Sequence, residues 1–330
     1  MKRHFQQIDV IKGVAILAVL LLHSFTRQQL EDSYAVYHIW QAVPLFMVVM
    51  GLNLGISVQG KEQRLGQLYT RKYFTKKAAR IFVPFLIIFI ASILAGLLWE
   101  AVTQEKVLEF NGYTWLGVLP VTGRGNYFIT LLLQSVLLLP IMGYGFARAP
   151  VITTALLVLL EIAFQLWASS YSYFDANNYL YDAAFPRYFS AVAFGFWLSR
   201  LLGEPFKGRH FIFLGSAAFV AIVVLYLLVY DVLSVEYLVR PEWQLQQPLT
   251  FGYAAMLVWL GLKLLPSTSS AIWLQLPAEL GKASYHIFLV QVVYFGLADQ
   301  DLPVTINLLL PVSLGYLFFK YEKTLLFGKV

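Results

Sequence analysis

The chain contains no cysteine among its 330 residues, and only 13% of its side chains are charged. The missing thiols exclude disulfide bonds, thiolate catalysis, thiol-linked lipid anchors and metal sites with cysteine ligands. Paired zinc-ligand spacings, a nucleophile elbow and a phosphate-binding glycine loop are also absent, so the sequence predicts no metal site. Soluble domains carry about 25% charged residues. The composition therefore excludes an ordinary soluble globular protein.

Apolar residues take the place of the missing charges: 59% of the chain is hydrophobic and the mean hydropathy is +0.68. A helix of about 17 to 25 apolar residues crosses a bilayer. The sequence predicts an all-α, polytopic membrane protein with about ten transmembrane helices. The ten segments are residues 8–27, 40–58, 81–102, 127–146, 150–170, 187–202, 211–230, 249–265, 283–298 and 304–319.

The distribution of basic residues predicts the orientation. With the N-terminus in the cytoplasm, eighteen Lys and Arg residues lie on the inner side and five lie in outer loops. The positive-inside rule then places both termini in the cytoplasm. We expect residues 1–330 to form a single integral membrane domain in the cell membrane, most simply the bacterial cytoplasmic membrane, in contact with membrane lipids. The net charge of +6 follows this topology and requires no nucleic-acid partner.

The first hydrophobic segment carries three ionisable residues, Asp9, Lys12 and His23. Such groups are expensive inside a membrane and usually functional. Eleven helical steps bring His23 back to the face of Lys12, roughly 16 Å further along the axis. Asp9 and Lys12 have the spacing of an ion pair, which is also compatible with a purely structural role near the inner interface. His23 is either a proton-transfer group or a hydrogen-bonding residue between helices.

A cluster of basic residues follows the second segment. Lys77 and Arg80 are three residues apart, a spacing that suits a phosphate clamp at the start of the third segment. The alternative is an anchor for anionic lipid headgroups. The cluster comprises Lys61, Arg64, Arg71, Lys72, Lys76, Lys77 and Arg80.

Other polar positions give weaker signals. Glu161 lies in the middle of the fifth segment, His286 opens the ninth, and Glu100 near the outer end of the third is either a substrate contact or an interface residue. The outer loops are rich in Tyr, Trp, Asn and Gly, which suits either a carbohydrate-facing surface or an aromatic belt at the headgroups.

The motifs together resemble the acyltransferase-3 family of integral membrane acyltransferases over nearly the whole chain. The first motif is Asp9-Val10-Ile11-Lys12-Gly13 followed by His23, and the others are Pro44-Leu45-Phe46 with Gly51, Lys77-Ala78-Ala79-Arg80 and Leu280-Gly281-Lys282-Ala283-Ser284-Tyr285. Tyr127-Phe128 is similar to an aromatic pair that begins the fourth helix in relatives. Three positions depart from the pattern: Met50 stands in place of Ser, Gln291 in place of His, and Lys12 in place of the commoner Arg. Unlike Arg, Lys cannot bind an anion through two parallel hydrogen bonds.

The resemblance implies an O-acyltransferase that moves an acyl group, most simply acetyl, from cytoplasmic acyl-CoA to a hydroxyl of a surface polysaccharide or its lipid-linked precursor. His23 is then the general base, supported by Lys12 and Asp9. Arg71, Lys72, Lys76, Lys77 and Arg80 are expected to bind the CoA phosphates, and Tyr127 and Glu100 to contact the acceptor. Acyl-CoA is a substrate, and no permanently bound cofactor is expected. A covalent acyl intermediate is an open alternative, as are a transporter of an anionic or glycan substrate and an inactive partner of a polysaccharide-export assembly.

Overall fold

The protein is all-helical in the part that the computed structural model describes. That part comprises residues 5–59, 64–202, 204–230, 232–233, 240, 245–298 and 302–327. Within it, the one β interaction is an isolated antiparallel bridge between Leu108 and Val121. The predicted all-α class is therefore confirmed.

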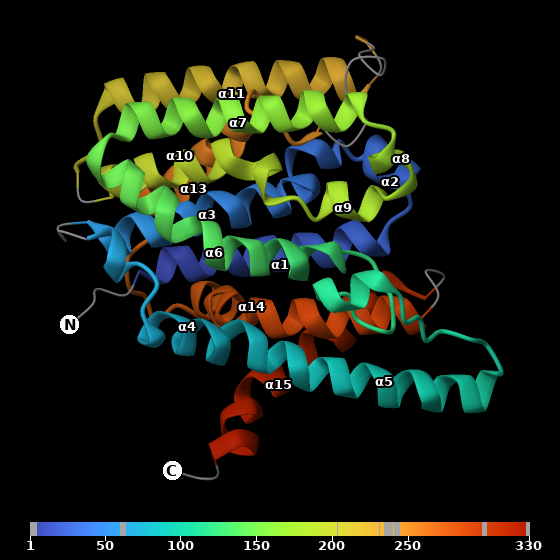
Figure 1. Ribbon diagram of the computed structural model, residues 1–330. Helices are drawn as coiled ribbons and strands as arrows, with labels where there is room; N and C mark the ends of the chain where they lie inside the picture. The colour runs from blue at the N-terminus through green and yellow to red at the C-terminus, as the bar shows by residue number, and fades with distance from the viewer. Residues whose placement is uncertain are drawn as a thin grey trace.

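Long helices occupy the positions of all ten predicted segments. Most of them run side by side, and α15 points away from the others at an angle (Figure 1). Seven helical stretches among the described residues are long and apolar enough to cross a bilayer. Ten crossings and cytoplasmic termini remain predictions, and residues 1–4 and 328–330 lie outside the described part. The ten helices are α1 (Gln6–Ser24), α3 (Ala42–Val58), α5 (Val83–Thr103), α6 (Tyr127–Arg148), α7 (Pro150–Ser170), α10 (Phe189–Leu201), α11 (Gly208–Val229), α13 (Phe251–Leu264), α14 (Ile272–Leu297) and α15 (Val304–Phe327).

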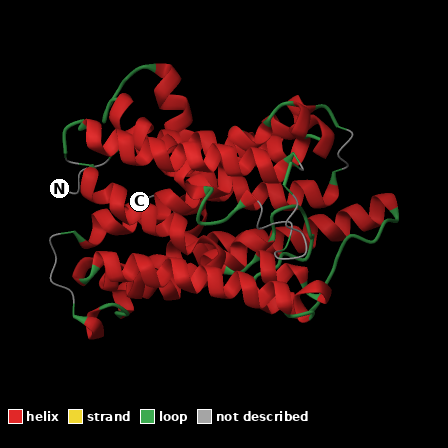
Figure 2. Cartoon of the chain, turned by 90° about the horizontal axis from the view of Figure 1, so that it is seen from above, coloured by secondary structure: helices red, strands yellow, loops and turns green. Residues whose placement is uncertain are grey.

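The helix α1 lies in the middle of this bundle. One hydrophobic cluster joins it to α3, α10 and α13, and a second joins it to α5, α14 and α15. In Figure 1, α7 and α11 form the layer farthest from α5 and α15. The view along the perpendicular direction shows the same side-by-side arrangement of helices, with loops gathered at both ends (Figure 2). Most residues of α1 are therefore buried within the protein, and Val14 is the exception at 51% exposed.

Glycines allow α1 and α14 to approach closely. A side chain at Gly13 would overlap the main-chain carbonyl of Pro277, and one at Gly281 would overlap the carbonyl of Asp9. Small residues at helix contacts are the usual way in which membrane helices pack tightly. The glycines of the first and last sequence motifs thus meet each other across one helix crossing.

Two predicted boundaries were wrong. The helix α14 begins at Ile272 and not near 283, because its first turns pack on α1 and Pro277 forfeits only one helical hydrogen bond near the helix start. The basic segment was expected to be an inner loop whose last part, Lys76–Arg80, runs into the third helix, but it is already helical from Arg71. The helices α4 (Arg71–Lys77), η4 (Ala78–Phe82, a π-helix) and α5 are continuous. The Thr70 hydroxyl begins this helix by accepting the N–H of Tyr73 at 3.2 Å.

Short helices fill the connections between the long ones. They are α2 (Arg27–Asp32), η1 (Ala35–Tyr37), η2 (Ile39–Gln41), η3 (Leu65–Gln67), η5 (Gly112–Leu116), α8 (Tyr173–Ala176), α9 (Asn178–Asp182) and η6 (Phe185–Tyr188).

Candidate active site

An ion pair lies near the start of α1. Lys12 Nζ is 2.6 Å from Asp9 Oδ1, the Asp9 residue is only 5% exposed, and the Lys12 side chain is 23% exposed. A charge pair in such surroundings interacts more strongly than one in water. The pairing predicted from the spacing of these residues is confirmed.

His23 lies in the last turn of α1, where main-chain carbonyls lack helical donors. Arg124, from the loop before α6, donates a hydrogen bond of 3.1 Å from Nη1 to the His23 carbonyl. The His23 ring packs edge-to-face on Phe295 of α14, with 5.8 Å between the ring centroids. The loop and α14 therefore hold the end of α1 that carries the imidazole.

The side chains of His23 and Gln291 both lie close to Gly125. It has a left-handed φ of +82°, and a β-carbon built on it would lie 3.3 Å from His23 Nε2 and 3.5 Å from Gln291 Nε2. Gln291 is fully buried in α14 and donates from Nε2 to the carbonyl of Arg124 at 3.1 Å. Sequence reasoning named Gln291 only as a departure from the family pattern. Its proximity to His23 is tertiary and has no local sequence signal.

The loop that carries Arg124 and Gly125 is fixed by its own hydrogen bonds. The Asn126 side chain accepts the N–H of Leu119 at 3.1 Å and donates to the Leu119 carbonyl at 3.4 Å. Gly123 lies directly against the main-chain carbonyl of Val292 on α14. These contacts fix the loop against α14.

Glu100 stabilises this loop indirectly, through the segment that follows α5. One of its carboxylate oxygens accepts the N–H groups of Val107 and Leu108, both at 2.9 Å. Leu108 forms the β-bridge with Val121, a few residues before Arg124. The structure therefore gives Glu100 a role in holding the connection after α5, and a contact with substrate stays a prediction.

Tyr127 begins α6 directly after this loop, but its hydroxyl faces Arg187 and Tyr188 rather than His23. Arg187 is 2% exposed, and its Nη1 lies 2.9 Å from Asp182 Oδ1. Its guanidinium also stacks 4.2 Å from the ring centroid of Tyr181. Tyr127 thus belongs to a buried polar cluster beside the candidate site.

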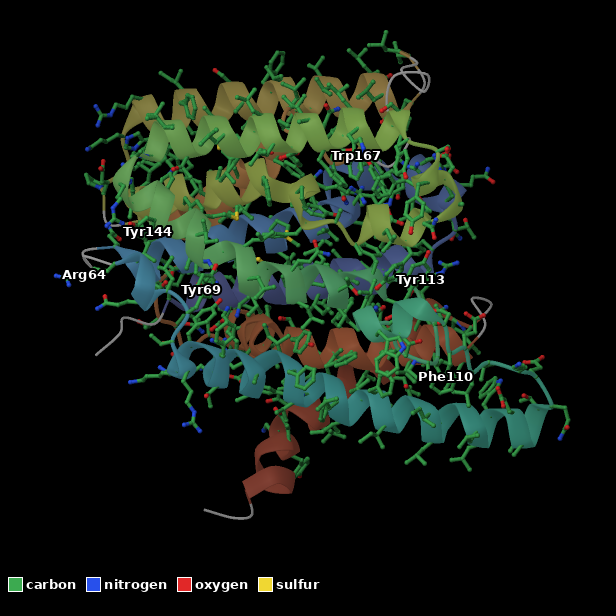
Figure 3. All side chains as sticks on the ribbon, in the orientation of Figure 1. Arg64, Tyr69, Phe110, Tyr113, Tyr144 and Trp167 are labelled. Atoms are coloured by element: carbon green, nitrogen blue, oxygen red, sulfur yellow. The ribbon has the colours of Figure 1, made fainter. Side chains whose placement is uncertain are left out.

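Aromatic residues gather at the end of the molecule that carries His23, where Figure 3 labels Phe110, Tyr113 and Trp167. Tyr113 stacks on Tyr179 with 4.9 Å between the centroids. Burial raises the pKa of Tyr179 to about 12, so this phenol stays protonated and hydrogen-bonded to Thr130. The carbohydrate-facing and headgroup-belt interpretations both fit this arrangement.

The basic residues lie at the end of the molecule opposite to His23. We call it the basic end and define it by the Lys and Arg residues of α4 and η4. Arg71, Lys72, Lys76 and Arg80 are exposed there, Lys77 is half-buried, and Lys61 lies outside the described residues. Figure 3 shows Arg64, Tyr69 and Tyr144 at this end. Lys77 Nζ lies 5.7 Å from the ring centroid of Tyr73. Because Ala78–Phe82 is a π-helix, Lys77 and Arg80 are not related by the α-helical step assumed for a clamp.

The π-helix is tied to α14. Tyr285 donates a hydrogen bond of 2.9 Å from its hydroxyl to the main-chain carbonyl of Ile81, next to Arg80. Single π-helical turns are frequent at functional sites. Two sequence motifs, around Arg80 and around Tyr285, thus meet in the structure.

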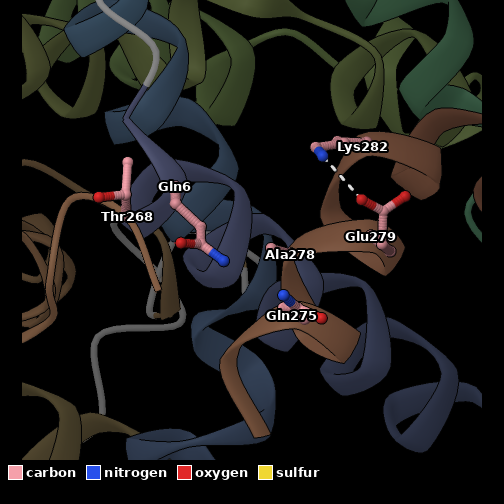
Figure 4. Close-up of a pocket in the computed structure, with 6 residues that line it drawn as sticks. All are labelled: Gln6, Thr268, Gln275, Ala278, Glu279 and Lys282. Atoms are coloured by element: carbon pink, nitrogen blue, oxygen red, sulfur yellow. Dashed lines mark hydrogen bonds and ion pairs between the residues drawn. The ribbon is translucent and has the colours of Figure 1, made fainter. Parts of the chain in front are cut away.

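A pocket of about 310 Å³ opens near the start of α1, between this helix and α14 (Figure 4). The Lys282 Nζ and the Glu279 Oε1 pair there at 2.7 Å. The pocket is lined by Gln6, Thr268, Gln275, Ala278, Glu279 and Lys282. Lys282 belongs to a motif noted in the sequence, but its place beside a pocket was not predicted.

Other intramembrane polar groups are paired within the protein. Glu161 Oε2 accepts both the N–H and the hydroxyl of Ser190 at 2.7 Å. His286 Nε2 lies 2.9 Å from Glu322 Oε2. Both arrangements join neighbouring helices, which fits a structural role.

Comparison with known proteins gives one match. The acyltransferase-3 family model, described as an acyltransferase domain, matches residues 5–319. No curated protein and no solved structure matches the chain.

Proposed function

The chain belongs to the acyltransferase-3 family, and on this premise we propose that it moves an acyl group, most simply acetyl, from cytoplasmic acyl-CoA to a hydroxyl of an extracytoplasmic glycan or its lipid-linked precursor. The family match supports a membrane acyltransferase in general. The donor, the acceptor and the residue roles below are our proposal.

The position of His23 is the observation that carries the proposal. It lies at the opposite end of α1 from the Asp9–Lys12 pair and from the basic end of the protein. Acyl-CoA is anionic at its phosphates and reactive at the far end of a long pantetheine arm. A donor bound by Arg71, Lys72, Lys76, Lys77 and Arg80 would direct its thioester along α1 toward His23. This polarity matches a basic cytoplasmic face and an acceptor on the other side.

The proposed reaction balances without a further reagent. His23 takes the proton of the acceptor hydroxyl as the oxygen attacks the thioester carbonyl. The carbon–sulfur bond then breaks, and the CoA thiolate receives the proton from His23. General-base catalysis of this kind contributes typically about 10²–10⁴-fold in rate. In this scheme the Asp9–Lys12 pair orders the path of the donor, and Tyr127 and Glu100 support the acceptor side.

Mass spectrometry of surface glycans from a deletion strain and its complemented strain tests the proposal. We expect the deletion to remove a mass increment equal to one acyl group and the complement to restore it. Reconstituted protein supplied with acetyl-CoA should release CoA. Glycans with unchanged acylation but reduced export would favour the transporter alternative, and unchanged acylation and export would refute the proposal.

A further inference from the structure

Two side-chain nitrogens converge on Gly125 from different helices. His23 Nε2 of α1 and Gln291 Nε2 of α14 lie 3.3 and 3.5 Å from the position that a β-carbon would occupy there. Because the residue is glycine, no side chain fills the space between the two nitrogens. Phe288 and Phe295 border the same region with their rings. We call the space at this β-carbon position the gap, and the rings of Phe288 and Phe295 its apolar walls.

Gln291 retains hydrogen-bonding capacity in this gap. A primary amide has two N–H donors and one carbonyl acceptor. One N–H of Gln291 is used by the Arg124 carbonyl at 3.1 Å. Its Oε1 is buried and has no hydrogen-bond partner among the described residues. Fully buried polar atoms are nearly always paired, and each exception requires an explanation.

We propose that Gln291 holds the attacking acceptor hydroxyl against His23. The hydroxyl donates its proton to His23 Nε2 and accepts the second N–H of Gln291. The unpartnered Oε1 then accepts a hydrogen bond from a neighbouring donor of the bound glycan or from a water that accompanies it. This inference rests on the proposed acyltransferase function and adds a substrate-positioning residue to it.

The apolar walls make this arrangement effective. A hydrogen bond shielded from water is electrostatically stronger, and an attacking group held in one orientation reacts faster. An oxygen atom at the β-carbon position of Gly125 would lie 3.3 Å from His23 Nε2 and 3.5 Å from Gln291 Nε2, so both nitrogens face one such atom.

The test replaces Gln291 with Leu, which has similar volume and no hydrogen bonds. The matched control is Gln7→Leu. Gln7 lies on α1 and is buried like Gln291. Its Nε2 donates to the main-chain carbonyl of Leu265 at 3.0 Å, and its Oε1 has no hydrogen-bond partner among the described residues. The assay follows CoA release by protein in phosphatidylethanolamine–phosphatidylglycerol vesicles. Acetyl-CoA is the donor, and either de-acylated surface glycan or water alone is the acceptor.

We expect Gln291→Leu to lower kcat about 10-fold or more with both acceptors and to raise KM for the glycan, because one hydrogen bond in the reacting complex is lost. KM for acetyl-CoA should not change. Gln291→His, which keeps an N–H donor, should restore most of the rate, and Gln7→Leu should keep normal kcat. Equal kcat and KM in Gln291→Leu and wild type would overturn the inference. Inactive wild-type protein would instead overturn the proposed function.

A second pair of variants covers the case in which Gln291→Leu is unstable. Gly125→Ala puts a methyl group into the gap, and Gly117→Ala is its control. Gly117 lies in the same loop and also has a positive φ, +110°, so alanine strains the backbone at both positions. The methyl group added at Gly117 would meet its neighbours at 3.2 to 3.5 Å. We expect turnover to fall at least 10-fold further in Gly125→Ala than in Gly117→Ala. Equal turnover in the two variants would contradict a reacting hydroxyl at this position.

Discussion

The Tyr285 hydroxyl donates a hydrogen bond of 2.9 Å to the main-chain carbonyl of Ile81, and so joins α14 to the π-helix that carries Arg80. The same helix, α14, carries Gln291 beside His23. One helix therefore contacts both the basic segment and the candidate catalytic residue.

The first prediction concerns this contact. Tyr285→Phe should weaken acyl-CoA binding severalfold, because the π-helix that sets the direction of Arg80 loses its tie to α14. Stability should fall only slightly, since side-chain hydrogen bonds between membrane helices average about 0.6 kcal/mol. Calorimetry with CoA and thermal unfolding measure the two effects.

Tyr294→Phe is the control for this variant. Tyr294 also lies on α14 and donates to Asn307 Oδ1 at 2.6 Å, on the side of α15. It should lose similar stability and keep full CoA affinity. Equal CoA affinity in the two variants would show that the Tyr285 contact is structural only.

The second prediction concerns the donor site. The double variant Lys77→Ala/Arg80→Ala should lose at least 10-fold in CoA affinity, because charge-assisted hydrogen bonds contribute about 1.5–3 kcal/mol each. Arg209→Ala/Lys320→Ala removes the same charge from exposed positions on other helices and should bind CoA normally. If the two double variants bind CoA equally well, the basic end is a lipid anchor and not a donor site.

The sequence predicted helix positions better than it predicted the site. Long apolar runs locate helices because each must satisfy its own backbone hydrogen bonds in lipid. The Asp9–Lys12 pair followed from local spacing in the same way. Gln291 and Gly125 were missed because they meet His23 through the packing of α14 and a loop, which no periodicity encodes. The helical start at Arg71, ahead of Lys76, was missed because a polar, basic composition resembles a loop.

The third prediction concerns the Asp9–Lys12 pair. Lys12→Met removes the cation from a largely buried carboxylate, so the thermal midpoint should fall. The double variant Asp9→Asn/Lys12→Met should recover part of this loss, with a coupling of about 0.5–3 kcal/mol in the cycle. Strictly additive losses would show that the two side chains do not interact in the membrane.

The fourth prediction concerns orientation, and the absence of cysteine makes it direct to test. Gly66→Cys places a thiol at an exposed position of the basic end, and Trp115→Cys places one at a residue that is 93% exposed near the His23 end. An impermeant thiol reagent added to intact cells should label position 115 and not position 66. Labelling of position 66 would reverse the proposed topology and the side from which acyl-CoA enters.

The fifth prediction concerns His23 itself. His23→Gln keeps hydrogen-bonding capacity but cannot act as a base near neutral pH. Because its main-chain carbonyl still accepts the Arg124 hydrogen bond, the end of α1 should keep its position and CoA should bind normally. Acyl transfer should nevertheless fall by about 10² or more, since the hydroxyl proton has no acceptor. The measurement is the initial rate of transfer from acetyl-CoA to purified glycan at matched thermal stability. A structural histidine would tolerate Gln with near-normal turnover, and that outcome would refute the general-base role.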